Sequence, residues 1–145
     1  YLNDVGLLTN LLYGVNVNAV LQDIKSINLG TVYESVVAQE LAAHGFKLHY
    51  FDNKKKGEVD FLIDDYDQLT VLPLEIKSGK DYTEHSALSK FLDNPDYGIN
   101  RAFVFSNERE IFRKRGATYL PIYYCMFLYN EYREEPVILP ELEVI

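Results

Sequence analysis

The stretch GEVDFLID (residues 57–64), followed after a short turn by TVLPLEIKS (residues 70–78), decides the fold of this chain. Both runs alternate apolar and polar positions, and their apolar positions on one predicted face are Val59, Phe61, Ile63, Leu72, Leu74 and Ile76. A period of two is typical of a strand whose two faces differ. The polar turn between the runs predicts an antiparallel hairpin. Pro73 cannot donate a ladder hydrogen bond, which indicates an edge or a bulge near the start of the second strand.

The segments around this hairpin predict a mixed sheet with helices. Leucine and valine spacing predicts helices over residues 1–13, 17–27, 31–44 and 81–93, and alternation predicts further strands over residues 46–51 and 102–106. Residues 120–129 fit a strand and a helix equally well. The main elements therefore follow the order α-β-β-β-α-β, preceded by extra N-terminal helices. We expect an α/β fold with a mixed central β-sheet flanked by helices.

The composition is that of one ordinary globular domain, with 145 residues, 48% hydrophobic and 25% charged. The single cysteine, Cys125, excludes an intramolecular disulfide and a zinc site of four thiolates, and we expect a cytoplasmic location. No apolar run reaches the roughly 20 residues of a membrane span, so we expect no membrane association. Because the chain opens on Tyr1 and no repeat or linker divides it, we interpret residues 1–145 as one domain cut from a longer protein.

The net charge of −8 opposes nucleic-acid binding, because phosphate contacts depend on lysine and arginine. Two windows run against this balance, since residues 47–56 and residues 101–115 each carry a net charge of +3. The candidate phosphate contacts within them are Lys54, Lys55, Lys56, Arg113, Lys114 and Arg115. Basic runs of this kind are also common on a solvated face that binds nothing.

Asp60 and Glu75 predict a metal site. Glu75 and Lys77 lie on one face of their predicted strand about 7 Å apart, and Asp60 lies on the neighbouring strand of the hairpin. Two carboxylates brought together repel each other unless a cation neutralises them. Mg²⁺ takes oxygen ligands and often uses only one or two protein carboxylates. We therefore predict that Mg²⁺ or Mn²⁺ binds Asp60, Glu75 and the backbone carbonyl of Ile76.

A metal and a lysine in this arrangement suit phosphodiester hydrolysis. The metal would polarise a phosphoryl oxygen and lower the pKa of a bound water, while the Lys77 ammonium would stabilise developing negative charge. A glutamate and a lysine two residues apart are, by themselves, more often an exposed ion pair. The acidic residue Asp60 on the adjacent predicted strand favours the catalytic interpretation.

Glu34 is the fourth candidate for the site and has two interpretations. It lies on the apolar stripe of the predicted helix over residues 31–44, where its carboxylate would be close to the metal. Thr31-Val32-Tyr33-Glu34 is also a capping box, in which Thr31 caps the helix and Glu34 bonds back to the amide of Thr31. The two interpretations remain open.

The motifs GTVYE (residues 30–34), EVDF (residues 58–61) and LEIKS (residues 74–78), taken in this order, resemble the PD-(D/E)XK, or restriction-endonuclease-like, superfamily. With YLNDVGLL (residues 1–8) and IYYCMFL (residues 122–128), the chain is most similar to the uncharacterised C-terminal domain that follows an AAA-type ATPase module in bacterial and archaeal proteins. The resemblance implies a restriction-endonuclease-like core with Asp60, Glu75, Lys77 and Glu34 at the catalytic positions. It also implies an N-terminal ATPase module as a partner within the same protein.

Two functions follow from these observations. The first is a metal-dependent nuclease module, in which the basic residues of both windows contact phosphates. The second is a catalytically silent nuclease-like fold that binds its ATPase, another protein or DNA. The retained acidic residues and lysine favour the first, whereas the net charge of −8 favours the second. An oligomer is compatible with either.

Overall fold

The computed structural model describes residues 4–14, 29–55, 57–79, 83 and 86–132. Its helices are α1 (Val5–Tyr13), α3 (Gly30–Ala43) and α4 (Ser86–Leu92), with 3-10 helices η2 (Pro95–Tyr97) and η3 (Ile122–Phe127). Its strands are β1 (His49–Asn53), β2 (Gly57–Asp65), β3 (Thr70–Lys77), β4 (Ala102–Ser106), β5 (Phe112–Lys114) and β6 (Ala117–Pro121). The helix predicted over residues 17–27 lies outside the described residues.

The strands form one six-stranded sheet in the order β1-β2-β3-β4-β6-β5. The pairs β1–β2, β2–β3 and β5–β6 are antiparallel, whereas β3–β4 and β4–β6 are parallel. The predicted order α-β-β-β-α-β is confirmed by α3, β1, β2, β3, α4 and β4. The chain is therefore a mixed α/β fold, as expected.

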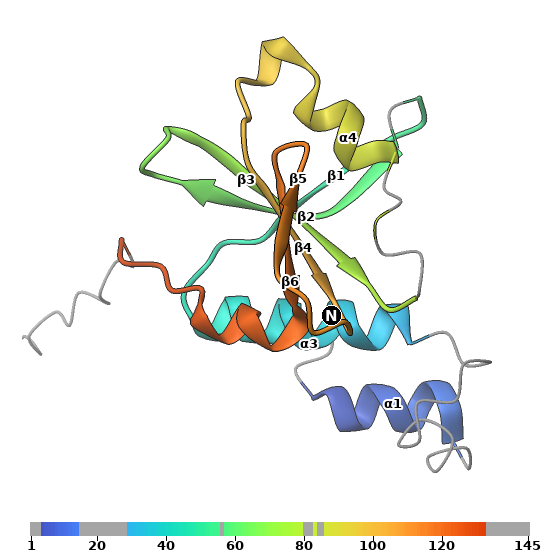
Figure 1. The fold of residues 1–145 in the computed structure, drawn as a ribbon. Helices are drawn as coiled ribbons and strands as arrows, with labels where there is room; N and C mark the ends of the chain where they lie inside the picture. The colour runs from blue at the N-terminus through green and yellow to red at the C-terminus, as the bar shows by residue number, and fades with distance from the viewer. Residues whose placement is uncertain (1–3, 15–28, 56, 80–82, 84–85, 133–145) are drawn as a thin grey trace, which may run out of the picture.

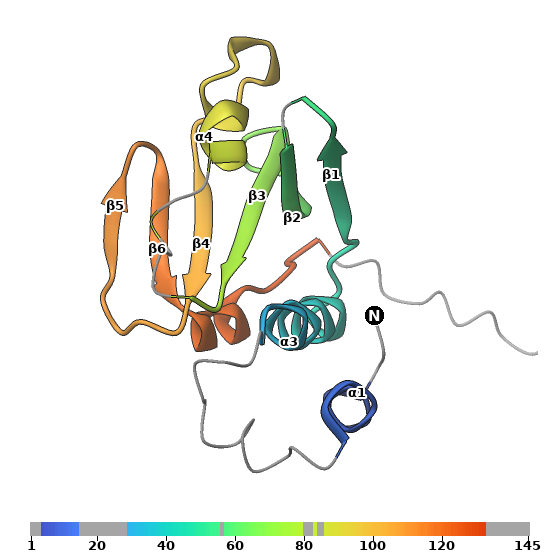
Figure 2. The same cartoon turned by 90° about the vertical axis from the view of Figure 1, so that its right-hand side faces the viewer.

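Helices cover both faces of the sheet (Figure 1). On one face, α3 and η3 bury the first core cluster, which includes Val37, Leu41, Phe61 and Leu74. On the other face, α4 buries the second cluster through Leu88 and Phe91. α1 lies outside α3, away from the sheet, as both views show (Figure 2). A strand that is covered on both faces needs apolar residues on both, which explains why β4 reads AFVFS.

Pro73 lies where β3 has a neighbour on one side only. It pairs with Leu62 of β2, but the ladder between β3 and β4 begins one residue later, at Leu74 and Phe103. Proline has no N–H group for a ladder bond, so this position suits it. The edge predicted near the start of this strand is confirmed.

Several elements differ from the prediction in their bounds or their presence. The strand predicted over residues 46–51 begins only at His49, because residues 46–48 connect α3 to the sheet. Residues 120–129, which fitted strand and helix equally, contain both, since β6 ends at Pro121 and η3 follows directly. The short strand β5 was not predicted. It pairs with β6 through a two-residue turn, Arg115–Gly116, in which both residues have positive φ.

The expectation that Val59 and Phe61 share one face of the sheet is wrong. Val59 packs in the second core cluster with α4, and Phe61 packs in the first with α3. The cause is a register shift in the β1–β2 ladder, where His49 pairs with Leu62 but Phe51 pairs with Val59. β2 thus has one extra residue at this point, and a β-bulge of this kind reverses the facing of the residues on either side of it.

Gly57 provides a test of how closely α4 packs on the start of β2. It has φ +95°, and a Cβ at this position would lie 2.7 Å from the Cβ of Ala87 in α4. Gly57→Ala should lower the free energy of unfolding by about 2–5 kcal/mol, since positive-φ strain and overpacking both contribute. Gly98→Ala is the control, because Gly98 has φ +62° and open space around it, and only strain of about 1–2 kcal/mol applies. Equal losses in urea denaturation would contradict the close packing.

Candidate functional site

The predicted acidic residues gather at the end of the sheet where β2 and β3 separate. The β2–β3 ladder runs from Asp65 paired with Thr70 to Phe61 paired with Leu74, so Asp60 and Glu75 lie just beyond its last pair. On its other side β3 stays paired to β4 as far as Lys77 and Ser106. The site therefore lies on two strands that have parted but still belong to one rigid sheet.

A hydrogen bond from the backbone to Asp60 joins the separated strands. The N–H of Ile76 donates to Oδ2 of Asp60 over 2.6 Å. The charge on the carboxylate makes this bond stronger than a ladder bond between neutral groups. It fixes Asp60 beside β3 and leaves its Oδ1 as a second possible ligand atom.

Glu75 is a buried carboxylate with one partner. Only 5% of the residue is exposed, and its Oε1 lies 2.6 Å from Nζ of Lys77. Its Oε2 is buried and has no hydrogen-bond partner among the described residues. A buried polar atom without a partner costs about 1–3 kcal/mol, and more when it carries charge. Glu75 therefore has an oxygen suited to a ligand.

The pKa values of three carboxyl groups at this site are raised. Burial, followed by the negative charge of Asp60, raises the pKa of Glu75 to about 7 against the opposing effect of Lys77. Burial also raises the pKa of Asp60, although the N–H of Ile76 acts in the other direction. Burial and the charge of Asp60 raise the pKa of Glu34. Mutual repulsion of this kind is what a bound cation would relieve.

The capping-box interpretation of Glu34 is wrong. Helix α3 begins at Gly30 with Leu29 as its N-cap and no side-chain cap, so Thr31 already lies within the first turn. Thr31 instead offers its carbonyl to the hydroxyl of Ser35 over 2.7 Å. Glu34 lines a pocket of about 400 Å³ together with Asp60. The structure thus brings Glu34 to the acidic site.

The same pocket contains residues that the sequence analysis did not identify as candidates for the site. Its remaining lining residues are Leu48, His49, Tyr50, Glu58 and Phe61. Glu58 belongs to the quoted EVDF motif, and its charge raises the pKa of both Glu34 and Asp60, so the motif itself contained this signal. His49 and Tyr50 reach the pocket at the bulge between β1 and β2. The alternation of apolar and polar residues in the sequence does not predict this bulge.

The donor set suits a hard divalent cation that keeps several waters. Among residues 4–14, 29–55, 57–79, 83 and 86–132, no three His, Cys, Asp or Glu side chains converge to hold a metal ion. Asp60, Glu75 and the carbonyl of Ile76 offer two carboxylates and one backbone oxygen, which is enough for Mg²⁺. The unpartnered Oε2 of Glu75 is the observation that favours this fit.

The predicted phosphate contacts lie in two separate places. Lys54 and Lys55 are exposed in the turn from β1 to β2, only a few residues before Asp60. Lys56 lies outside the described residues. Arg113, Lys114 and Arg115 are exposed on the β5–β6 hairpin, at the opposite edge of the sheet from β1. The structure therefore places Lys54 and Lys55 close to the start of β2, where Asp60 lies. It places the β5–β6 hairpin, with Arg113, Lys114 and Arg115, three strands away from β3.

The single cysteine, Cys125, is buried. It is 4% exposed, and burial raises the pKa of its thiol to about 11, so the thiolate is scarce at neutral pH. Within the part of the chain that the structure describes, every helix is too short or too polar to span a bilayer.

The fold and the site define a mixed α/β domain with a buried carboxylate–lysine pair at one end of its sheet. Residues 29–125 match the family model of DUF4143, a domain of unknown function, and the chain belongs to this family. The matched region runs from the start of α3 to η3 and contains all four predicted catalytic residues. A search of curated proteins found no significant match.

Glu75→Gln should become relatively more stable as the pH rises. With a pKa of about 7 in the folded protein and 4.5 as the ordinary value, Glu75 binds more protons in the folded than in the unfolded state between these pH values. Stability of the wild type therefore falls as pH rises through this window, and the uncharged glutamine escapes that fall. The variant should gain about 2–4 kcal/mol relative to wild type between about pH 4 and pH 8.

Urea denaturation in EDTA at both pH values measures this difference. Glu110→Gln is the control, since Glu110 is exposed and its replacement should leave the pH dependence unchanged. A wild type and a Glu75→Gln variant with parallel pH profiles would show that Glu75 ionises normally.

Proposed function

We propose that this chain is a metal-dependent nuclease module that hydrolyses phosphodiester bonds. The observation that carries the proposal is Glu75, a carboxylate that is 5% exposed and has one oxygen without a partner in the described part of the chain. A fold does not keep such a group for stability, because burying it is costly. A costly charged group that a protein retains in its interior is a common sign of function.

In this proposal Asp60, Glu75 and the carbonyl of Ile76 hold Mg²⁺ or Mn²⁺. The metal, when bound, would polarise a phosphoryl oxygen and lower the pKa of a coordinated water. Lys77 keeps 29% of its side chain exposed, so its ammonium group can contact a phosphate while remaining beside Glu75. Its charge stabilises the negative charge that develops during hydrolysis.

Glu34 would act from the opposite wall. It projects from α3 into the pocket that Asp60 lines, and the raised pKa of its carboxyl keeps its proton exchangeable closer to neutral pH. A carboxyl group of this kind can orient a water molecule or accept its proton. Lys54 and Lys55 on the nearby turn supply positive charge for the backbone of a nucleic acid.

The arrangement of elements supports the same proposal at the level of fold. α3, the antiparallel strands β1–β3, α4 and the parallel strand β4 follow the order of the restriction-endonuclease-like core that the sequence motifs resemble. We also propose, from that resemblance, that an AAA-type ATPase module precedes this domain in the natural protein. Such a module would supply nucleic-acid affinity that a chain of net charge −8 lacks.

A second function is favoured by the pairing of Lys77. Its Nζ already lies 2.6 Å from Glu75 Oε1, so without a metal the site is a partly neutralised ion pair. With this pairing and the charge of −8, the domain would serve as a nuclease-like module that binds its ATPase, another protein or DNA without cleaving. Metal binding tests the site itself, and cleavage of a nucleic acid distinguishes the two functions.

Wild-type protein should bind Mn²⁺ weakly, and Asp60→Asn should abolish the binding, because it removes one of two carboxylate ligands. Titration calorimetry after EDTA treatment measures this. Asp64→Asn is the matched control, since Asp64 is an exposed carboxylate near the far end of the same strand and its loss should leave the titration unchanged. Identical heats from wild type and Asp60→Asn would contradict the proposed metal site.

Cleavage should be slow for the isolated domain and should depend on Mg²⁺ or Mn²⁺ and on Glu75. Single-stranded and duplex DNA and RNA, incubated at low salt to strengthen weak phosphate contacts, provide the assay. Glu75→Gln and Lys77→Met should abolish any product, whereas Glu110→Gln should not. Metal binding that requires Asp60, together with no cleavage of any substrate when the domain is linked to its ATPase module, would decide for the binding function.

A further inference from the structure

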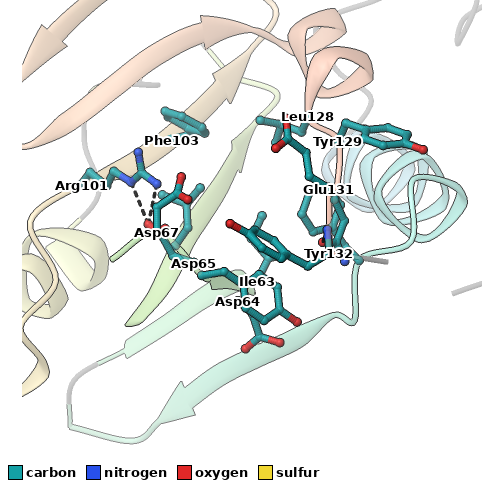
Figure 3. A pocket seen from close by; sticks show the side chains of 14 residues that line it. Ile63, Asp64, Asp65, Asp67, Arg101, Phe103, Leu128, Tyr129, Glu131 and Tyr132 are labelled. Atoms are coloured by element: carbon teal, nitrogen blue, oxygen red, sulfur yellow. Dashed lines mark hydrogen bonds and ion pairs between the residues drawn. The ribbon is translucent and has the colours of Figure 1, made fainter. Parts of the chain in front are cut away.

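A second pocket lies at the opposite end of β2 from the acidic site, and the proposed nuclease activity makes no use of it (Figure 3). Its volume is about 290 Å³. The end of β2, the turn after it, the start of β4 and residues 128–132 form its walls. We call it the acidic pocket, after Asp64, Asp65, Asp67 and Glu131.

One wall of the acidic pocket is fixed by an ion pair between a buried carboxylate, Asp65, and an exposed guanidinium group, Arg101. Oδ2 of Asp65 accepts hydrogen bonds from Nε of Arg101 over 2.8 Å and lies 2.7 Å from its Nη2. Its Oδ1 accepts a hydrogen bond from the N–H of Gln68 over 3.2 Å. Asp65 is 6% exposed. This pairing uses both Asp65 and Arg101, so the lining keeps an excess of negative charge from three further carboxylates.

Those three carboxylates, Asp64, Asp67 and Glu131, are exposed. They accompany exposed tyrosines: Tyr66 is 45% exposed, Tyr129 is 65% exposed and Tyr132 is 57% exposed. The rings of Tyr66 and Tyr132 lie 4.7 Å apart at 44°. An aromatic face beside carboxylates attracts a guanidinium or ammonium group. Tyrosine is also enriched where proteins meet other proteins.

The chain itself carries a complementary surface. Arg113, Lys114 and Arg115 are exposed on the β5–β6 turn region, which we call the basic hairpin. Together with Arg101, they line a hollow of about 480 Å³, and no acidic residue is among the described residues that line it. Arginine joins tyrosine among the residues that contribute most to binding energy at interfaces.

The acidic pocket and the basic hairpin are neighbours, because Arg101 and Phe103 line both hollows. None of the three basic residues of the hairpin lines the acidic pocket, so the hairpin does not fill the pocket of its own chain. When a second copy docks around a twofold axis, the acidic patch of each copy can contact the basic patch of the other, so both patches are neutralised at once.

We propose that two copies of this chain associate, with the basic hairpin of each copy in the acidic pocket of the other. Arg115 stands at the tip of the two-residue turn and is the residue placed to reach the tyrosines. One hairpin in one pocket on each chain makes a small, polar interface. We therefore expect weak association, with a dissociation constant on the order of 10⁻⁵–10⁻⁴ M. Each chain contributes its basic hairpin to one contact and its acidic pocket to the other. Both surfaces are then occupied, so the assembly stops at a dimer.

Sedimentation velocity of the wild type over a concentration series tests the association. A monomer–dimer equilibrium should be present at about 50 mM salt and should weaken strongly at about 500 mM, because exposed charge pairs are screened. A wild type that remains monomeric at millimolar concentration and low salt would overturn the proposal, as would a dimer that salt does not affect.

Charge reversal tests which surfaces meet. Arg113→Glu with Arg115→Glu makes the hairpin acidic, and Asp64→Lys with Asp67→Lys makes the pocket basic. Each double variant alone should be monomeric, because like charges then face each other. An equimolar mixture of the two should form a dimer again, since both contacts regain opposite charges. Circular dichroism verifies that each variant is folded.

Lys54→Glu with Lys55→Glu is the matched control, as it changes the net charge by the same amount in another exposed turn. This variant should dimerise like the wild type. A mixture that stays monomeric, while the single preparations are folded, would show that the hairpin and the pocket do not meet. Loss of dimer in the control variant would show that net charge alone governs the association.

Discussion

The hydrogen bond from the N–H of Ile76 to Oδ2 of Asp60 is the contact on which the candidate site depends. It lies where the β2–β3 ladder has ended, so a side chain takes the place of the next rung. The bond keeps Asp60 beside β3, close to Glu75, although the ladder between the two strands has ended. Without this hydrogen bond, the repulsion between the carboxylates of Asp60 and Glu75 would move them apart.

The sequence predicted those parts of the fold that depend on local alternation. Leu72, Leu74 and Ile76 pack on one face of β3, and Glu75 and Lys77 pair on the other, because an unbroken strand has a fixed period. The bulge opposite Tyr50 could not be predicted, since it results from how β1 and β2 align and not from either strand alone. Glu34 could not be assigned either, because the N-cap is Leu29, two residues before Thr31, and this removes the capping box.

The two ends of the sheet use charge in different ways. At the end with Asp60, carboxylates are crowded around one lysine, and burial strengthens their repulsion. At the other end, Asp65 is buried too, but a guanidinium group satisfies its Oδ2. Only the first arrangement leaves a buried oxygen without a partner among the described residues, which is why our proposals place chemistry at that end and recognition at the other.

The bulge in the β1–β2 ladder has a consequence for how this protein behaves in a crowded solution. β1 is an edge strand of five residues, and open edges invite other chains to add a strand, which leads to aggregation. The extra residue of the bulge lies in β2, directly beside this edge. A bulge increases the local twist, and a twisted edge is a poorer template for strand addition. The irregularity that shapes the candidate site thus also makes the edge beside it less open to strand addition by other copies.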